Sequence, residues 1–83
     1  MDPHMYPEAS IELHRQRTAL APEAAAAFKA FNQAVFADGA LSSKMKDLIA
    51  VAVAHTTQCP YCIRGHTASA LRKGATEQEV MEA

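Results

Sequence analysis

The segment from Ser43 to Thr57 constrains the fold of this chain more than any other, because it is apolar all the way around a helix axis. Its apolar residues recur at helical spacing on one face and also fill the opposite face: Met45, Leu48, Ile49, Ala52 and Val53 on the first, Ala50, Val51 and Ala54 on the second. A helix of this kind is normally buried on most of its faces. Its β-branched residues would also suit a strand, but its length, its alanine content and a capping serine (Ser42 or Ser43) favour a helix.

Helix signals also follow one another along the rest of the chain. We expect further helices over residues 8–20, 22–37, 60–74 and 76–83. Pro22 and Pro60 suit a first helical turn, where the missing N–H costs nothing. Gly39 is expected to end the second helix in a left-handed conformation. Thr76 and Glu79 have the spacing of a capping box.

The small size and the alanine-rich composition predict self-association. A chain of 83 residues buries only about 60% of the surface that its unfolded form exposes, and alanine contributes little buried area per residue. We therefore expect an all-α fold in one small domain over residues 1–83, with a loose arm at residues 1–7 and helices packed in a homo-oligomer. The last helix stops after a few residues, so we expect this element to be incomplete in the sequence.

Charge and hydropathy exclude several classes of partner. The net charge is −1, so there is no electrostatic case for binding nucleic acid or an anionic membrane surface. No apolar run reaches the roughly 18 residues of a membrane span. The first residues lack the basic and apolar regions of a secretory signal, and we expect a cytoplasmic protein. In that compartment a close cysteine pair is more often catalytic or metal-binding than structural.

The chemistry of the chain centres on Cys59, Cys62 and His66. Their spacing of i, i+3 and i+7 places all three along one face of a helix. Both sulfurs would lie in the first turn, where free N–H groups and the helix dipole stabilise a thiolate and lower a cysteine pKa from about 8.5 towards 3.5–7.5. His66 follows one turn later and can accept a thiol proton. The alternative is two buried apolar cysteines beside a surface histidine.

Three nearby residues leave alternatives open. Asp47 lies in the first turn of the apolar helix, where a solvated charge would favour the helix N-terminus. His55 would complete a zinc site with the cysteines and His66, but four ligands from one contiguous stretch fit a tetrahedral site poorly, and a place at the helix end suits it better. Tyr61 either packs or lines the thiol pocket.

Residues 41–83 resemble the core of the alkylhydroperoxidase D-like proteins of the carboxymuconolactone decarboxylase superfamily. The resemblance lies in Leu41-Ser42-Ser43-Lys44-Met45-Lys46-Asp47-Leu48-Ile49-Ala50-Val51-Ala52-Val53-Ala54, in Cys59-Pro60-Tyr61-Cys62-Ile63 with His66, and in the run from Leu71 to Glu82. Its specific part is a carboxylate twelve residues before the first cysteine of Cys-x-x-Cys-x-x-x-His.

The resemblance implies an all-helical fold in trimers or hexamers and thiol-dependent reduction of hydroperoxides. It implies that Cys62 attacks the peroxide, that Cys59 resolves the sulfenic acid, and that His66 and a carboxylate relay protons. Asp47 stands where the family carries glutamate. A hydroperoxide and a thiol reductant are the implied partners, and no cofactor or metal is expected. The competing functions are a lactone decarboxylase, whose members typically lack the cysteine pair, and a non-catalytic oligomeric or metal-binding module.

Overall fold

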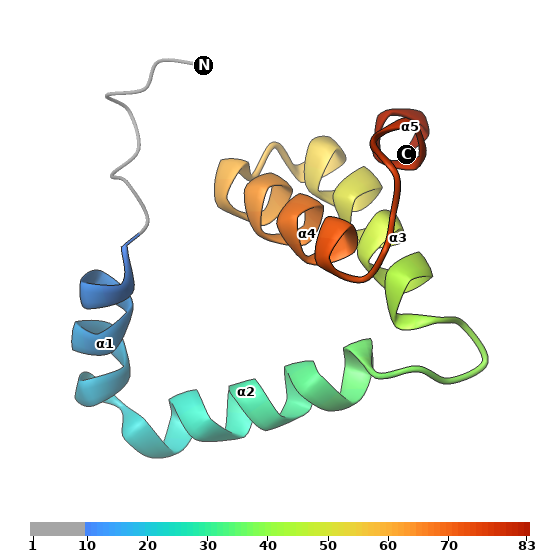
Figure 1. Ribbon diagram of the computed structural model, residues 1–83. Helices are drawn as coiled ribbons and strands as arrows, with labels where there is room; N and C mark the ends of the chain where they lie inside the picture. Colours follow the sequence, from blue (N-terminus) through green and yellow to red (C-terminus); the bar gives the residue numbers. More distant parts are fainter. Residues whose placement is uncertain (1–9) are drawn as a thin grey trace. The chain divides into compact units, whose positions relative to one another are not determined.

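A computed structural model describes residues 10–83, and this part of the chain is helical without a strand (Figure 1). The predicted all-α fold is confirmed; the expected loose arm at residues 1–7 lies outside the described residues. The helices are α1 (Ile11–Leu20), α2 (Pro22–Phe36), α3 (Ser43–Thr57), α4 (Pro60–Arg72) and α5 (Glu77–Glu82). The chain divides into two compact units, one reaching Asn32 and the other running from Gln33 to Ala83.

Side chains cap the helix starts where the sequence predicts. The Ser42 hydroxyl accepts a hydrogen bond from the N–H of Met45 at 3.0 Å, so Ser42 rather than Ser43 caps α3. Thr76 and Glu79 form the predicted capping box of α5, with reciprocal bonds of 3.0 and 2.9 Å. These bonds satisfy N–H groups that have no partner within the helix.

The end of α2 differs from the prediction. The helix stops at Phe36, and Gly39 does not adopt the left-handed conformation, since Gly74 is the one glycine of residues 10–83 with a positive φ. The physical reason lies on α3, where the Lys46 ammonium donates to the carbonyl oxygens of Val35 and Ala37 at 2.9 and 2.7 Å. Lys46 thus satisfies carbonyl groups that a left-handed glycine cap would otherwise serve.

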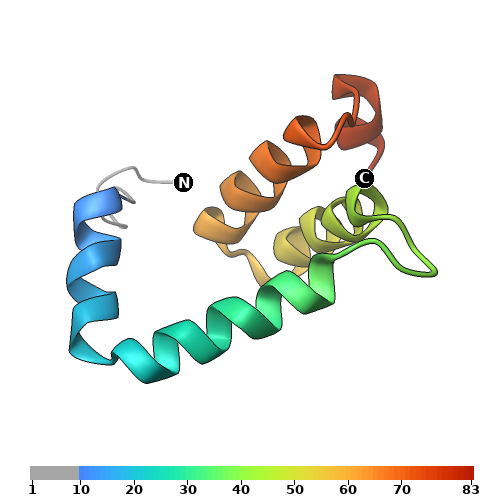
Figure 2. The same ribbon diagram turned by 60° about the horizontal axis from the view of Figure 1, so that its bottom comes forward.

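The second unit holds all the core that residues 10–83 form. Helices α3 and α4 lie side by side, and α5 packs at their end (Figures 1 and 2). Leu48 of α3, Ala70 of α4 and Ala75 form a buried cluster, against which the half-buried Val80 packs. Val51 and Ala54 of α3 are buried as well. Alanine at these contacts lets the helix backbones approach closely. This small core fixes α3 against α4, which carry the candidate site.

Much of the apolar surface remains exposed. Met45, Ile49 and Val53 form a stripe on the outer side of α3, and they are 44%, 46% and 54% exposed. In the first unit, α1 contains no buried residue, and Phe28 and Phe31 of α2 are exposed as well. The prediction that α3 is covered on most faces is therefore not met within the described chain.

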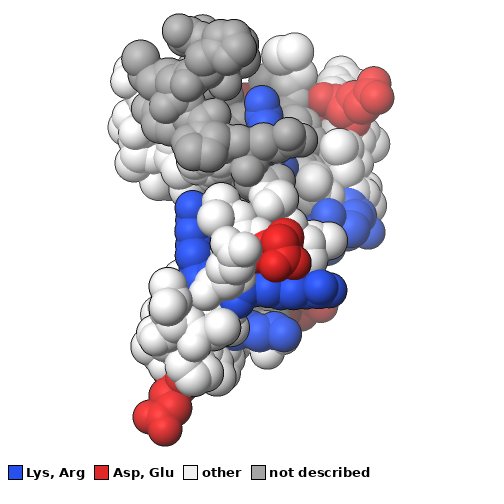
Figure 3. Space-filling model, turned by 90° about the vertical axis from the view of Figure 1, so that its left-hand side faces the viewer, with Lys and Arg blue, Asp and Glu red and all other residues white. Residues whose placement is uncertain are grey.

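Charged side chains do not separate by sign. The face drawn in Figure 3 carries basic and acidic side chains among uncharged ones. None of the helices in residues 10–83 has the length and hydropathy needed to cross a membrane.

Candidate functional site

Asp47 lies deeper in α3 than the first turn in which the sequence placed it. Helix α3 begins at Ser43, which makes Asp47 its fifth residue and leaves no acidic residue in the first turn. The expected position in the first turn is therefore wrong, because the capping serine is Ser42 and the helix starts directly after it. The residue is 1% exposed. A solvated charge at a helix end does not describe Asp47.

Three side chains from α4 and its C-terminal cap surround the carboxylate of Asp47. Nδ1 of His66 lies 3.2 Å from Oδ1, the Ser69 hydroxyl donates to Oδ2 at 2.7 Å, and the Lys73 ammonium donates to Oδ2 at 2.6 Å. Residues 66, 69 and 73 are three and four positions apart, so they share one helix face. Aspartate is shorter than the glutamate of the resembled motif, yet it reaches His66 directly.

These bonds decide the ionisation of Asp47. Burial by itself raises the pKa of this carboxyl, but the hydrogen bonds from Lys73, Ser69 and His66, together with the Lys73 charge, outweigh burial and lower the pKa below its usual value. Asp47 is therefore an ionised carboxylate with a compensating cation.

An aromatic ring from the end of α2 closes the cluster. The rings of Phe36 and His66 stack, with centroids 5.2 Å apart and planes inclined by 26°. The Lys73 ammonium lies 5.8 Å from the centroid of the same Phe36 ring, within the range of a cation–π interaction. Phe36 thus contacts both ends of the polar cluster. The Lys46 bonds to the α2 carbonyls hold this end of the helix in place.

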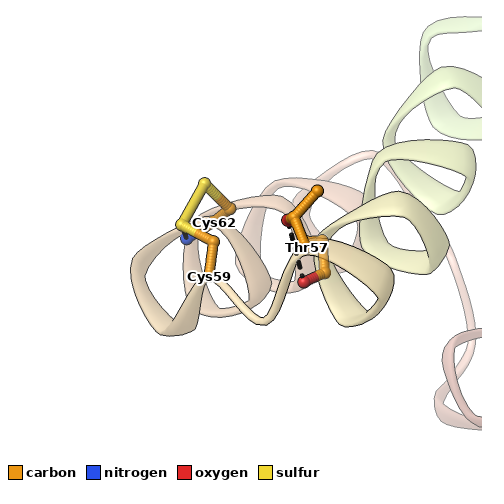
Figure 4. Close-up of a disulfide and its surroundings, with 4 residues drawn as sticks. Thr57, Cys59 and Cys62 are labelled. Carbon is orange, nitrogen blue, oxygen red and sulfur yellow. Dashed lines mark hydrogen bonds between the residues drawn. A yellow bond between two sulfur atoms is a disulfide. The ribbon is translucent and has the colours of Figure 1, made fainter.

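The cysteine pair opens α4. Cys59 is the N-cap residue, and its Sγ accepts a hydrogen bond from the Cys62 N–H at 3.2 Å. The predicted place of both sulfurs at the first turn is confirmed, and they form a disulfide with a Cα–Cα distance of 5.3 Å (Figure 4). Cys62 is exposed and Cys59 is half-buried. At the end of α3, the Thr57 hydroxyl donates to the Ala54 carbonyl at 3.2 Å.

The structure brings Asp47 and His66 together but does not bond His66 to a sulfur atom. In the disulfide state His66 hydrogen-bonds to Asp47, and no hydrogen bond joins it to Cys59 or Cys62 within residues 10–83. Neither sulfur of a disulfide carries a proton, so His66 has no thiol proton to accept in this state. His66 and the cysteines nevertheless lie on one helix, with His66 four residues after Cys62.

His55 is not part of this cluster. It lies in the last turn of α3, where its Nδ1 is 2.8 Å from the Val51 carbonyl oxygen. This is the helix-end position that we expected. In the described range no three or more His, Cys, Asp or Glu side chains are grouped so as to hold a metal ion. Tyr61 is 38% exposed.

Sequence reasoning missed Ser69, Lys73 and Phe36. Ser69 and Lys73 follow His66 at helical spacing, and that spacing is the signal that identifies them once Asp47 is known to face α4. Phe36 lies thirty residues before His66, and no local pattern connects the two.

The described chain is an all-helical protein with a cysteine pair at a helix N-terminus and a buried carboxylate bonded to a half-buried histidine. The chain belongs to the carboxymuconolactone decarboxylase family, whose family model matches residues 22–83. The resemblance found in residues 41–83 is thus confirmed, and the match extends through α2. The family includes enzymes.

Two relatives support this membership. An uncharacterized protein of the cox locus of Paracoccus denitrificans is 61% identical over 57 residues, which cover 69% of this chain and 51% of the relative. An uncharacterized protein of Cupriavidus necator is 40% identical over 74 residues, which cover 86% of this chain and 66% of the relative. The chain thus spans about half to two thirds of the length of these relatives. No solved structure matches the chain.

The lowered pKa of Asp47 predicts a specific dependence of stability on pH. Because the folded state holds the ionised carboxylate more strongly than the unfolded state, its contribution is complete above about pH 4 and is lost as the pH falls through the lower folded value. Asp47→Asn should reduce stability at neutral pH and remove part of the loss of stability in acid. Urea midpoints measured between about pH 2 and pH 7 test this.

Glu82→Gln is the matched control for this measurement. Glu82 is exposed at the end of α5, and its substitution should leave the pH profile close to that of the wild type. Identical acid profiles for wild type and Asp47→Asn would contradict the assigned ion cluster.

Proposed function

We propose that this protein is a thiol-dependent peroxidase, a thiol–disulfide oxidoreductase that reduces hydroperoxides through Cys59 and Cys62. The observation that carries the proposal is the disulfide at the start of α4, on the helix whose His66 is bonded to the buried Asp47. Membership of a family that includes enzymes is consistent with it.

The proposed reaction begins at Cys62. Its thiolate attacks the outer oxygen of the hydroperoxide, the O–O bond breaks, and the leaving alkoxide or hydroxide takes a proton and departs as alcohol or water. Cys62 is then a sulfenic acid. The Cys59 thiol attacks this sulfur, a disulfide forms, and water leaves. An external thiol reductant returns the disulfide to two thiols by exchange.

Exposure and helix position favour Cys62 as the attacking residue. Cys62 is exposed whereas Cys59 is half-buried, so a peroxide reaches Cys62 more easily. Cys62 is also the third residue of α4, within the turn whose free N–H groups and dipole stabilise a thiolate. The Cα–Cα distance of 5.3 Å lets Cys59 resolve the sulfenic acid without a large movement of the backbone.

His66 is the proposed proton acceptor for the thiols, with Asp47 as its partner. A positioned acid–base group typically contributes about 10²–10⁴ in rate. The direct Asp47–His66 bond fixes one side of the imidazole, which leaves the other nitrogen for proton transfer. A cytoplasmic location suits this proposal, because thiol systems there keep a cysteine pair reduced.

The two cysteines should respond differently to substitution. Cys62→Ser should abolish peroxide turnover, because no sulfenic acid forms. Cys59→Ser should give one sulfenic acid that a dimedone probe traps and that is not resolved within the chain. The measurement is peroxide consumption combined with the intact mass after one equivalent of peroxide. If the two variants behave alike, the assigned roles are wrong.

Substitution of Asp47 should slow the thiol step. In Asp47→Asn, His66 loses its anionic partner, and we expect alkylation of the reduced thiols and peroxide reduction to fall about 10²-fold or more. Asp47→Glu restores the residue of the family motif and should retain most of the activity. Both variants are compared with Glu82→Gln under conditions where circular dichroism shows native helix content; unchanged rates in Asp47→Asn would remove Asp47 from the mechanism.

We further propose a homo-oligomer, a trimer or a hexamer, that covers the stripe of Met45, Ile49 and Val53. Large apolar residues exposed side by side on one helix indicate an interaction surface. Light scattering at micromolar concentration should give a multiple of the chain mass, and Ile49→Lys should lower it. Arg72→Met is the surface control, and a wild-type monomer would overturn this proposal.

A further inference from the structure

Ser69 and Lys73 bind Asp47 but have no part in the proposed reaction. Both contact the same carboxylate oxygen, Oδ2, at 2.7 and 2.6 Å. We propose that they are positioning residues that hold Oδ2, so that Oδ1 accepts a hydrogen bond from the Nδ1–H of His66 and Nε2 is left as the proton-accepting nitrogen of the ring. The catalytic meaning of this inference rests on the proposed function.

The two oxygen atoms of the Asp47 carboxylate have different hydrogen-bond partners. Oδ2 accepts hydrogen bonds from a hydroxyl and an ammonium, whereas the one partner of Oδ1 among residues 10–83 is His66, at 3.2 Å. The Asp47 side chain is 2% exposed, so water does not compete for either oxygen. An ionised carboxylate only accepts hydrogen bonds, which requires Nδ1 of His66 to be the donor. In a neutral imidazole the lone pair is then on Nε2.

The Lys73 ammonium supplies the counter-charge for the Asp47 carboxylate. A buried carboxylate without a counter-charge would favour the imidazolium, and an imidazolium cannot accept a proton from a thiol. The ammonium of Lys73 balances Asp47 and thereby removes this bias.

Two other charged side chains of the second unit, both on α3, are engaged elsewhere. On α3, Lys46 bonds to the carbonyls of Val35 and Ala37, and Lys44 pairs with Glu79 of α5 at 3.2 Å. The group that α2 brings to His66 is the uncharged Phe36 ring. The balance at His66 therefore depends on Asp47 and Lys73.

Phe36 supports this arrangement from the apolar side. Its ring stacks on the imidazole, and the ammonium of Lys73 lies 5.8 Å from the ring centroid. Stacking restricts rotation of the His66 ring, and the cation–π contact keeps the lysine stem near the carboxylate. The side chains of Lys73 and His66 are 32% and 30% exposed, so neither is fixed by burial alone.

The test is nitrogen NMR of His66 in the reduced protein at pH 7, which reports the tautomer and the ratio of charged to neutral imidazole. The neutral form of wild-type His66 should carry its proton on Nδ1. Lys73→Met keeps the stem and removes the charge, and it should raise the charged-to-neutral ratio on the order of tenfold. Arg72→Met removes the same charge one residue away on an exposed side chain and should change the ratio less than twofold.

Two further variants keep the test independent of folding. Lys73→Arg retains the cation and should behave like the wild type. Ser69→Ala removes a hydroxyl without changing charge and should shift the ratio in the same direction as Lys73→Met, by a smaller factor. A proton on Nε2 of wild-type His66 overturns the inference, and so do equal charged-to-neutral ratios in Lys73→Met and Arg72→Met. If Lys73→Met does not fold, a Ser69→Ala variant with the wild-type ratio overturns it.

Failure of this inference is distinguishable from failure of the proposed function. Peroxide turnover is measured on the same samples. The expected NMR changes in a protein without peroxide turnover would leave the role of Ser69 and Lys73 intact and reject the peroxidase. Turnover in the wild type together with an unchanged ratio in Lys73→Met would keep the peroxidase and reject the positioning role.

Discussion

The buried carboxylate of Asp47 is the interaction on which the second unit depends. It accepts bonds from His66, Ser69 and Lys73, and it is the one buried charged residue in the described chain. Burying a charge is costly unless it is paired and hydrogen-bonded. Helix α3 therefore cannot shift or rotate against α4 without leaving this charge unsatisfied. The small apolar core between the two helices, made of Leu48, Val51 and a few alanines, lacks comparable directional bonds.

The same helix, α4, connects this polar cluster with the cysteine pair. The disulfide lies at the N-terminus of α4, Lys73 caps its C-terminus, and His66 lies between them. The two ends of a helix differ electrostatically: the N-terminal end stabilises a thiolate, and the C-terminal end stabilises a cation such as Lys73. One helix thus places the proposed nucleophile and a compensating cation where its own dipole favours each of them. His66 lies between them, bonded to the carboxylate that α3 supplies.

Local signals in the sequence were enough to predict the helices, a serine cap at Ser42 or Ser43, the cap at Thr76, and the cysteine pair at the start of a helix. Each depends on residues that are a few positions apart. The predicted left-handed cap at Gly39 was wrong because Lys46, which comes from the next helix, donates hydrogen bonds to the carbonyls at the end of α2. The alternative that Asp47 is a solvated helix-end charge is wrong for a similar reason, since α4 buries this carboxylate, whereas the resemblance had paired Asp47 with His66. Ser69, Lys73 and Phe36 could be assigned only after the faces of α3 and α4 that meet were known.

Helix α3 carries a residue of the candidate site on one face and an exposed apolar stripe on the other. Asp47, Val51 and Ala54 face α4, whereas Met45, Ile49 and Val53 remain exposed. A helix with two apolar faces is normally buried on both of them. Within the described chain, only the face of α3 that meets α4 is covered. Because α3 also carries the carboxylate that orients His66, any partner that covers its outer face also restrains the helix that supplies Asp47. In the proposed oligomer, subunit contacts and the geometry of the candidate site would be coupled through a single helix, and a loss of those contacts would alter the position of His66 without any change in the residues that touch it.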